Sequence, residues 1–90
     1  MLDIKHFKKD ATGALLVHFK KERQSGGYLY FLEDKKNNDR LGFFAENRNE
    51  FLFKAPMFLK ITLDLSEQCY SNVYMRNPTA KDNNTACIVI

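Results

Sequence analysis

Apolar and polar residues alternate over short runs along most of the chain, and clusters of Asn, Asp, Gly, Lys and Ser separate these runs. Alternation with a period of two is typical of strands that bury one face. The pattern predicts a mostly β fold, a small antiparallel β-barrel or meander, in a single domain over residues 1–90. We expect its strands at about 2–8, 14–21, 28–33, 40–45, 50–54, 57–65, 69–76 and 85–90.

The segment 11–24 has a second interpretation, a single helix that would make the fold α+β. Asp10 is a suitable N-cap for it, basic residues lie in its last turn, and Ser25-Gly26-Gly27 would end it. Gly13 and the β-branched Val17 weaken a helix at this place. Both interpretations stay open, and the strand is preferred.

A basic and aromatic tetrad occurs twice, since His6-Phe7-Lys8-Lys9 returns twelve residues later as His18-Phe19-Lys20-Lys21. Turn-forming residues follow each copy, so we expect a β-hairpin between the two copies. If its loop has an even number of residues, two or four, the numbers of two residues that face each other across the hairpin add up to 23. The core face then consists of Leu2, Ile4, Leu15, Val17 and Phe19. The other face consists of Lys5, Phe7, Lys9, His18 and Lys20. A three-residue loop would reverse this parity and bring both tetrad rings to one face.

Two later runs, 57–65 and 69–76, also place aromatic rings beside cations on the face that points away from the core. The residues in question are Phe58, Lys60, Tyr70, Tyr74 and Arg76. Aromatic rings and cations are therefore again expected together on a solvent-exposed strand face.

Interleaved rings and cations on strands are typical of proteins that hold single-stranded nucleic acid, because cations follow the phosphates and rings stack on unpaired bases. Aromatic residues make up 13% of the chain, and 14 Lys and Arg against 11 Asp and Glu give a net charge of +3. This charge permits an anionic partner without requiring one. We predict a single-stranded nucleic-acid-binding protein with little sequence preference. Its predicted contacts are Lys5, Phe7, Lys9, His18, Lys20, Phe58, Lys60, Tyr70, Tyr74 and Arg76.

The run Phe58-Leu59-Lys60-Ile61-Thr62-Leu63-Asp64 continues through Glu67-Gln68 to Tyr70 and Tyr74. This segment resembles one in the filamentous-phage single-stranded-DNA-binding proteins. In that family, a Lys-Ile-Thr-Leu-Asp strand likewise leads to a pair of tyrosines.

Arg23-Gln24, which precedes a glycine and Tyr28, is similar to the first binding-loop region of the same family, and Met1–Lys5 is similar to its first strand. Residues 29–57 are longer than the family's equivalent, and the segment after Tyr74 is shorter. The resemblance implies an OB-like barrel, a symmetric homodimer, and cooperative coating of single-stranded DNA. It also implies a phage origin, the host cytoplasm as location, and as contacts Arg23, Tyr28, Lys60, Tyr70 and Tyr74.

No pattern of catalytic or cofactor chemistry occurs in the sequence. His6 and His18 have no acidic or thiol neighbours at the spacing of metal ligands, and there is no Gly-rich phosphate loop. We therefore expect no enzyme, no metal and no cofactor. The alternative function is a small phage-type protein-interaction module or inhibitor, which occludes a host protein and uses the same rings as anchors.

No apolar run approaches the roughly 20 residues that span a bilayer, so we expect no membrane contact and a cytoplasmic location. In that compartment Cys69 and Cys87 would stay reduced as small core residues. Cys87-Ile88-Val89-Ile90 fits the prenylation pattern of a cysteine, two aliphatic residues and a final residue. We prefer its other interpretation, a final apolar strand of the core.

Overall fold

The computed structural model describes residues 7–34, 39–63, 72–80 and 83–89 of the chain. Seven strands and one helix lie within these residues. They are β1 (Lys8–Lys9), β2 (Leu15–His18), β3 (Lys20–Gln24), β4 (Gly27–Asp34), β5 (Asp39–Ala45), α1 (Arg48–Thr62), β6 (Asn72–Met75) and β7 (Thr85–Val89). The prediction of a mostly β fold is confirmed for the described part of the chain.

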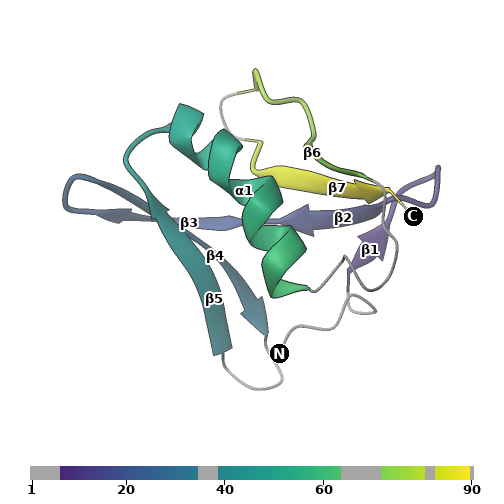
Figure 1. Cartoon of the computed structure of the whole chain (residues 1–90), viewed down its shortest axis with the longest axis horizontal. Coiled ribbons are helices and arrows are strands. Elements are labelled where there is room, and N and C mark those ends of the chain that lie inside the picture. The colour runs from purple at the N-terminus through teal and green to yellow at the C-terminus, as the bar shows by residue number, and fades with distance from the viewer. Residues whose placement is uncertain (1–6, 35–38, 64–71, 81–82, 90) are drawn as a thin grey trace.

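The described strands form two antiparallel sheets, one in the order β1-β2-β7-β6 and one in the order β3-β4-β5. They do not close into a barrel. Figure 1 shows α1 lying across both sheets, and buried residues of α1 share one core with residues of β2, β4 and β7. The helix therefore packs against both sheets.

A single residue, Phe19, separates β2 from β3, and Figure 1 shows the two strands following each other almost in line. Its backbone N–H donates to the carbonyl oxygen of Asn84 at 2.9 Å, and its side chain is fully buried. The strand expected at 14–21 is thus two strands in two different sheets. The alternative helix over 11–24 is wrong, because these residues form a turn and then pair with neighbouring strands.

The turn between β1 and β2 holds five residues, 10–14. The carboxylate of Asp10 accepts hydrogen bonds from Thr12 N (2.8 Å), Thr12 Oγ1 (2.6 Å) and Ala14 N (3.0 Å), which stabilise this turn. The expected even loop is therefore wrong. The reversed parity brings Phe7 against the core, where an even loop would have turned it to solvent.

The strands expected at 50–54 and 57–65 are wrong, because these residues belong to α1 or follow it. The helix buries three residues spaced four apart, Phe51, Ala55 and Leu59. This spacing competes with the period of two that predicted strands, and burial of one helix face decides between them. Pro56 lies inside the helix.

Polar residues before α1 supply its N-terminal cap. The side chain of Asn47 accepts a hydrogen bond from Glu50 N at 2.9 Å, as is typical of an N-cap. The carboxylate of Glu50 accepts from Lys54 Nζ at 2.7 Å, a pair spaced four residues apart on the helix surface. The residues between the strands expected at 40–45 and 50–54 therefore cap and begin a helix.

Aromatic rings join the helix to the sheet of β3, β4 and β5 and to Phe19, the residue between the two sheets. Five rings form this cluster, namely Phe19, Tyr30, Phe43, Phe51 and Phe58. The rings of Tyr30 and Phe51 stack with centroids 3.9 Å apart, and Phe19 meets Phe51 edge to face at 5.5 Å. Phe58, expected on a polar strand face, packs against this core.

The remaining strand predictions are confirmed where the structure describes them. Segments 28–33 and 40–45 form the hairpin of β4 and β5, and part of 69–76 forms β6. Of the strand expected at 2–8, residues 2–6 lie outside the described residues. Cys87 is a free, buried residue of β7, so its interpretation as part of a core strand is confirmed, while Cys69 lies outside the described residues.

Two phenylalanines on α1 provide a matched test of this packing. Phe51 is fully buried, whereas Phe53 is 76% exposed. We expect Phe51→Ala to lower the free energy of unfolding by about 3–5 kcal/mol, because it removes a buried ring that packs on Tyr30, Phe43 and Phe19. Phe53→Ala is the control and should change it by no more than about 0.5 kcal/mol in dilute protein. Urea unfolding followed by circular dichroism measures both, and equal losses would contradict this assignment of the core.

Candidate functional site

The predicted contact residues lie at separate places of the fold instead of in one groove. Phe7 and His18 line a common pocket, and Lys20 forms an ion pair with a residue of the pocket wall. Lys9 is exposed on β1 but does not line the pocket. Part of the face expected around the first hairpin is therefore brought together.

A second group lies at the end of the hairpin formed by β3 and β4. Arg23 pairs with Tyr28 across the two strands. The ammonium group of Lys21 lies 4.2 Å from the centroid of the Tyr28 ring, a cation–π contact. A ring and cations do meet here, although the ring of Tyr28 is half-buried and packs against the core.

Tyr74 and Arg76 lie on β6 and just after it, and both are exposed, as the alternation predicts. A hydrogen bond with Cys87 raises the pKa of the Tyr74 hydroxyl above its ordinary value. The other predicted contacts are Lys60, exposed on α1, Phe58, packed against the core, and Lys5 and Tyr70, which lie outside the described residues.

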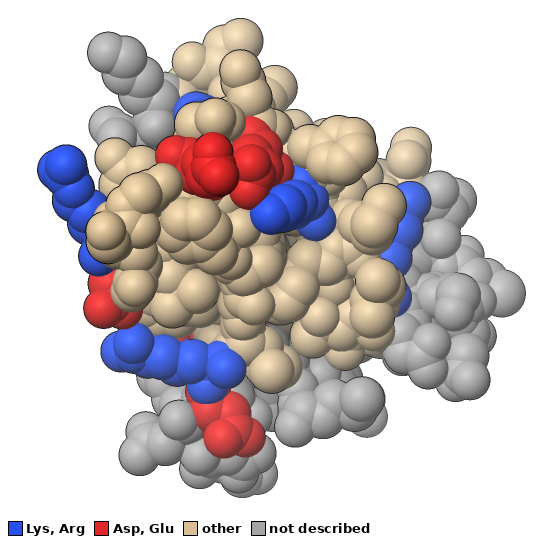
Figure 2. Space-filling model, turned by 60° about the vertical axis from the view of Figure 1, so that its left-hand side comes forward, with Lys and Arg blue, Asp and Glu red and all other residues tan. Residues whose placement is uncertain are grey.

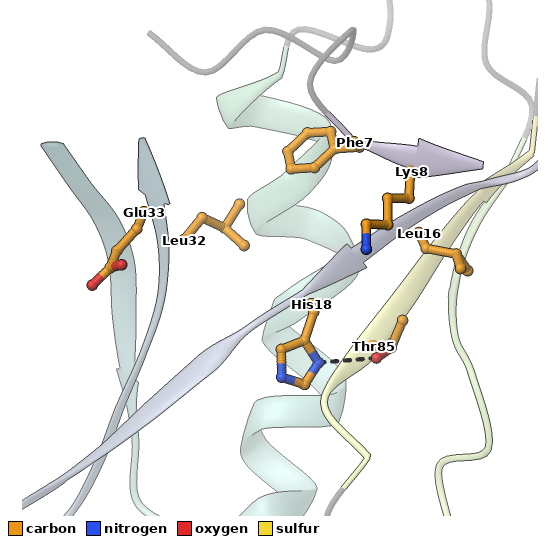
Figure 3. A pocket seen from close by; sticks show the side chains of 7 residues that line it. All are labelled: Phe7, Lys8, Leu16, His18, Leu32, Glu33 and Thr85. Carbon is orange, nitrogen blue, oxygen red and sulfur yellow. Dashed lines mark hydrogen bonds between the residues drawn. The ribbon is translucent and has the colours of Figure 1, made fainter. Parts of the chain in front are cut away.

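The pocket lies between the two sheets and has a volume of about 390 Å³ (Figure 3). Its walls come from β1 and the residue before it, and from β2, β4 and β7. The lining residues are Phe7, Lys8, Leu16, His18, Leu32, Glu33 and Thr85. Both an apolar ring and charged groups therefore reach one cavity.

The polar end of the pocket contains Lys8 and His18. The Nδ1 atom of His18 lies 3.1 Å from Thr85 Oγ1, and this hydrogen bond fixes the orientation of the imidazole. In Figure 3 the amino group of Lys8 points toward His18. Lys8 was missed from the sequence because an even hairpin loop would turn Lys9, not Lys8, to the side of His18.

Glu33 brings a negative charge to the pocket wall, and two cations offset it. Lys20 Nζ lies 2.7 Å from one carboxylate oxygen, and Arg40 Nε lies 3.6 Å from the other. The pair with Lys20 is partly screened by solvent, because the side chains keep 53% and 27% of their surface exposed. The charge of this carboxylate is nevertheless balanced locally.

The outer face of α1 carries three large apolar residues that the strand-based interpretation did not single out. Phe53, Met57 and Ile61 are 76%, 59% and 75% exposed. They lie four residues apart, so they follow one another along a single face of the helix. We call these three residues the α1 ridge, and their spacing was the sequence signal that could have identified it.

Glu50 and Lys54, on one flank of the ridge, are paired, whereas Lys60, exposed beside Ile61, forms no ion pair with any described residue. Lys54 donates to Glu50 Oε1 at 2.7 Å and to the carbonyl oxygen of Phe44 at 3.0 Å. Figure 2 shows a broad uncharged area on one face of the molecule, with Lys, Arg, Asp and Glu mainly at its margin. The ring of Phe44, on β5, adds a further exposed apolar surface.

Among the described residues, no three or more His, Cys, Asp or Glu side chains are placed so that they could hold a metal ion. The helix in the described part of the chain is not long and apolar enough to cross a membrane. No protein-family model, no curated protein and no solved structure matches this chain. Function must therefore be argued from the geometry of the pocket and the ridge.

The turn that positions β1, and with it one wall of the pocket, makes a testable electrostatic prediction. A hydrogen bond from the Thr12 hydroxyl to Asp10 lowers the pKa of that carboxyl below its ordinary value of 3.8. Because the pKa of Asp10 is lower in the folded protein than in the unfolded protein, the ionised carboxylate stabilises the fold at pH values above the pKa of the unfolded state. This contribution is lost as the pH falls through the folded pKa.

We expect Thr12→Val to raise the pKa of Asp10 back toward its ordinary value, because the largest cause of the shift is removed. A pH titration of the Asp10 carboxyl carbon by NMR measures this in the wild type and the variant. Equal midpoints in the two proteins would show that the turn does not hold the carboxylate in this way.

Proposed function

We propose that this chain is a protein-interaction module and that the α1 ridge is its contact surface. The observation that supports this most is the exposure of three large apolar side chains on successive helical turns. Together they present on the order of 400 Å² of apolar surface, which is the size at which a patch on a monomer tends to mark an interaction site. An amphipathic helix that uses such a row of anchors is a recurring mode of recognition.

The occupant that fits the ridge is a second copy of the chain. Phe53 and Ile61 lie equally far along the helix on either side of Met57. Two antiparallel copies of α1 would therefore place Met57 against its own copy and Phe53 against Ile61 of the other chain. A patch that contacts itself in this way is the isologous contact of a two-fold symmetric dimer.

On the flank of Glu50 and Lys54, charge does not oppose self-association. The ion pair between Glu50 and Lys54 leaves little net charge on that flank of the ridge, so a second copy meets little repulsion there. A symmetric pair would cover the ridge and its polar margin on both copies, which brings the contact toward the roughly 1,000 Å² that a specific interface needs. The apolar groove of a host protein is the other occupant that the same surface could receive.

We expect Met57→Cys to form a disulfide-linked dimer on mild oxidation, because the two sulfurs would face each other across the two-fold axis. Asn49→Cys is the matched control, exposed on the same helix but eight residues away, and should not cross-link. The wild type, oxidised in parallel, shows whether Cys69 or Cys87 forms an intermolecular disulfide by itself. Non-reducing electrophoresis distinguishes the three proteins.

A second measurement uses the native contact. We expect Phe53→Ser with Ile61→Ser to raise the dimer dissociation constant by about 30-fold or more, measured by sedimentation equilibrium. Tyr74→Ser, which removes an exposed residue from β6, should leave the constant unchanged. If the wild type stays monomeric while a benzoylphenylalanine at position 53 cross-links to a host protein, the host protein is the occupant. If the wild type forms no dimer and the residue at position 53 cross-links to no host protein, the proposal is contradicted.

Single-stranded nucleic-acid binding is our second candidate, and one observation favours it. Phe7 and His18 share a pocket beside Lys20, and Arg23 and Tyr28 meet at the hairpin of β3 and β4. Rings and cations therefore occur together at two places on the strands. This candidate does not depend on a closed OB-like barrel, since the described strands form two sheets.

The second candidate predicts micromolar or tighter binding of a fluorescent single-stranded oligonucleotide at low salt. The logarithm of the affinity should fall with the logarithm of the salt concentration, by about 0.7 for each phosphate contacted. Replacing Lys5, Lys9, Lys20 and Lys60 with Gln should abolish the binding. Lys54→Gln is the control, because Lys54 is exposed but is not among the predicted contacts. Binding that ignores salt, or none at low salt, would contradict this candidate.

A further inference from the structure

We propose that the pocket between the two sheets binds one anion that carries an aromatic ring, namely the base and phosphate of a single nucleotide. The second candidate function decides only whether this nucleotide is free or part of a single-stranded nucleic acid. The volume of about 390 Å³ lies in the range of sites for small molecules. A pocket of this volume has room for one aromatic ring and one anionic group.

The apolar part of the pocket suits a flat ring. Phe7, Leu16 and Leu32 come from the first, second and fourth strand regions, so both sheets contribute apolar surface. Figure 3 shows the ring of Phe7 on the side of Leu32. A base in this space can stack on Phe7 in the offset arrangement that aromatic pairs prefer.

The polar part of the pocket suits an anion. Lys8 forms no ion pair with any described residue, and in Figure 3 its amino group points toward His18. His18 uses Nδ1 for the hydrogen bond with Thr85, which leaves Nε2 for a ligand. The ammonium group of Lys8 can thus contact a phosphate oxygen, and Nε2 of His18, which Figure 3 shows on the side of the ring away from Lys8, remains for another group of the ligand.

The balance of charge favours an anion over a cation. Among the lining residues that the structure describes, Glu33 is the one carboxylate, and Lys20 and Arg40 offset it at 2.7 Å and 3.6 Å. Lys8 therefore supplies the uncompensated charge at this site. A neutral base without its phosphate, or a phosphate without a base, would use only half of the pocket.

The test titrates the full chain with deoxyadenosine monophosphate while the His18 ring is followed by NMR. We expect the His18 signal to shift, and deoxyadenosine or inorganic phosphate alone to bind at least tenfold more weakly. Lys8→Gln should weaken binding of the nucleotide tenfold or more. Lys54→Gln, an exposed lysine on α1 that lies outside the pocket and is paired with Glu50, is the control and should stay within twofold of the wild type.

A single-stranded oligonucleotide, titrated into the same variants, identifies the source of the ligand. If the mononucleotide binds in a Lys8-dependent way and the oligonucleotide does not bind, the pocket assignment holds and the second candidate function fails. If the oligonucleotide binds Lys8→Gln as tightly as it binds the wild type, that function holds and the pocket assignment is overturned. Inorganic phosphate that binds as tightly as the nucleotide, or a His18 signal unmoved by the nucleotide, also overturns it.

Discussion

The stack of Phe51 on Tyr30 is the contact on which the rest of the fold depends. Tyr30 belongs to the sheet of β3, β4 and β5, while Phe51 lies on α1 and also meets Phe19, where the chain passes to the other sheet. All three side chains are buried, so the stack excludes water where three elements meet. With one face of α1 committed to this contact, the opposite face must point to solvent, and it carries the ridge.

A polar contact completes the placement of α1. The guanidinium of Arg48, in the first turn, donates to the carbonyl oxygens of Pro78, Ala80 and Asn83 and to the side chain of Asn84. Arginine suits this role because its planar donors are held in a fixed arrangement. These bonds tie the start of the helix to the connection that leads into β7. Apolar packing thus sets which face of α1 is buried, and Arg48 sets where the helix begins.

The strand content and the central hairpin could be predicted from the sequence, because β5 alternates, β4 is a short apolar run rich in aromatic residues, and polar residues separate the two. Helix α1 could not, since its apolar residues fit both a period of two and a spacing of four, and only the buried neighbours choose between them. The pocket was found in part: Phe7, His18 and Lys20 were selected, but Lys8 depends on a loop length that local composition leaves open. The ridge was missed for the same reason as the helix.

Phe19 has a consequence for the energetics of the pocket. The chain passes from one sheet to the other through this one buried residue, so no flexible linker separates the walls that β2 and β4 contribute. The width of the cavity is therefore set by backbone geometry and core packing when the chain folds. A ligand that enters meets walls already ordered, and its binding free energy is not reduced by the entropy of closing a loop.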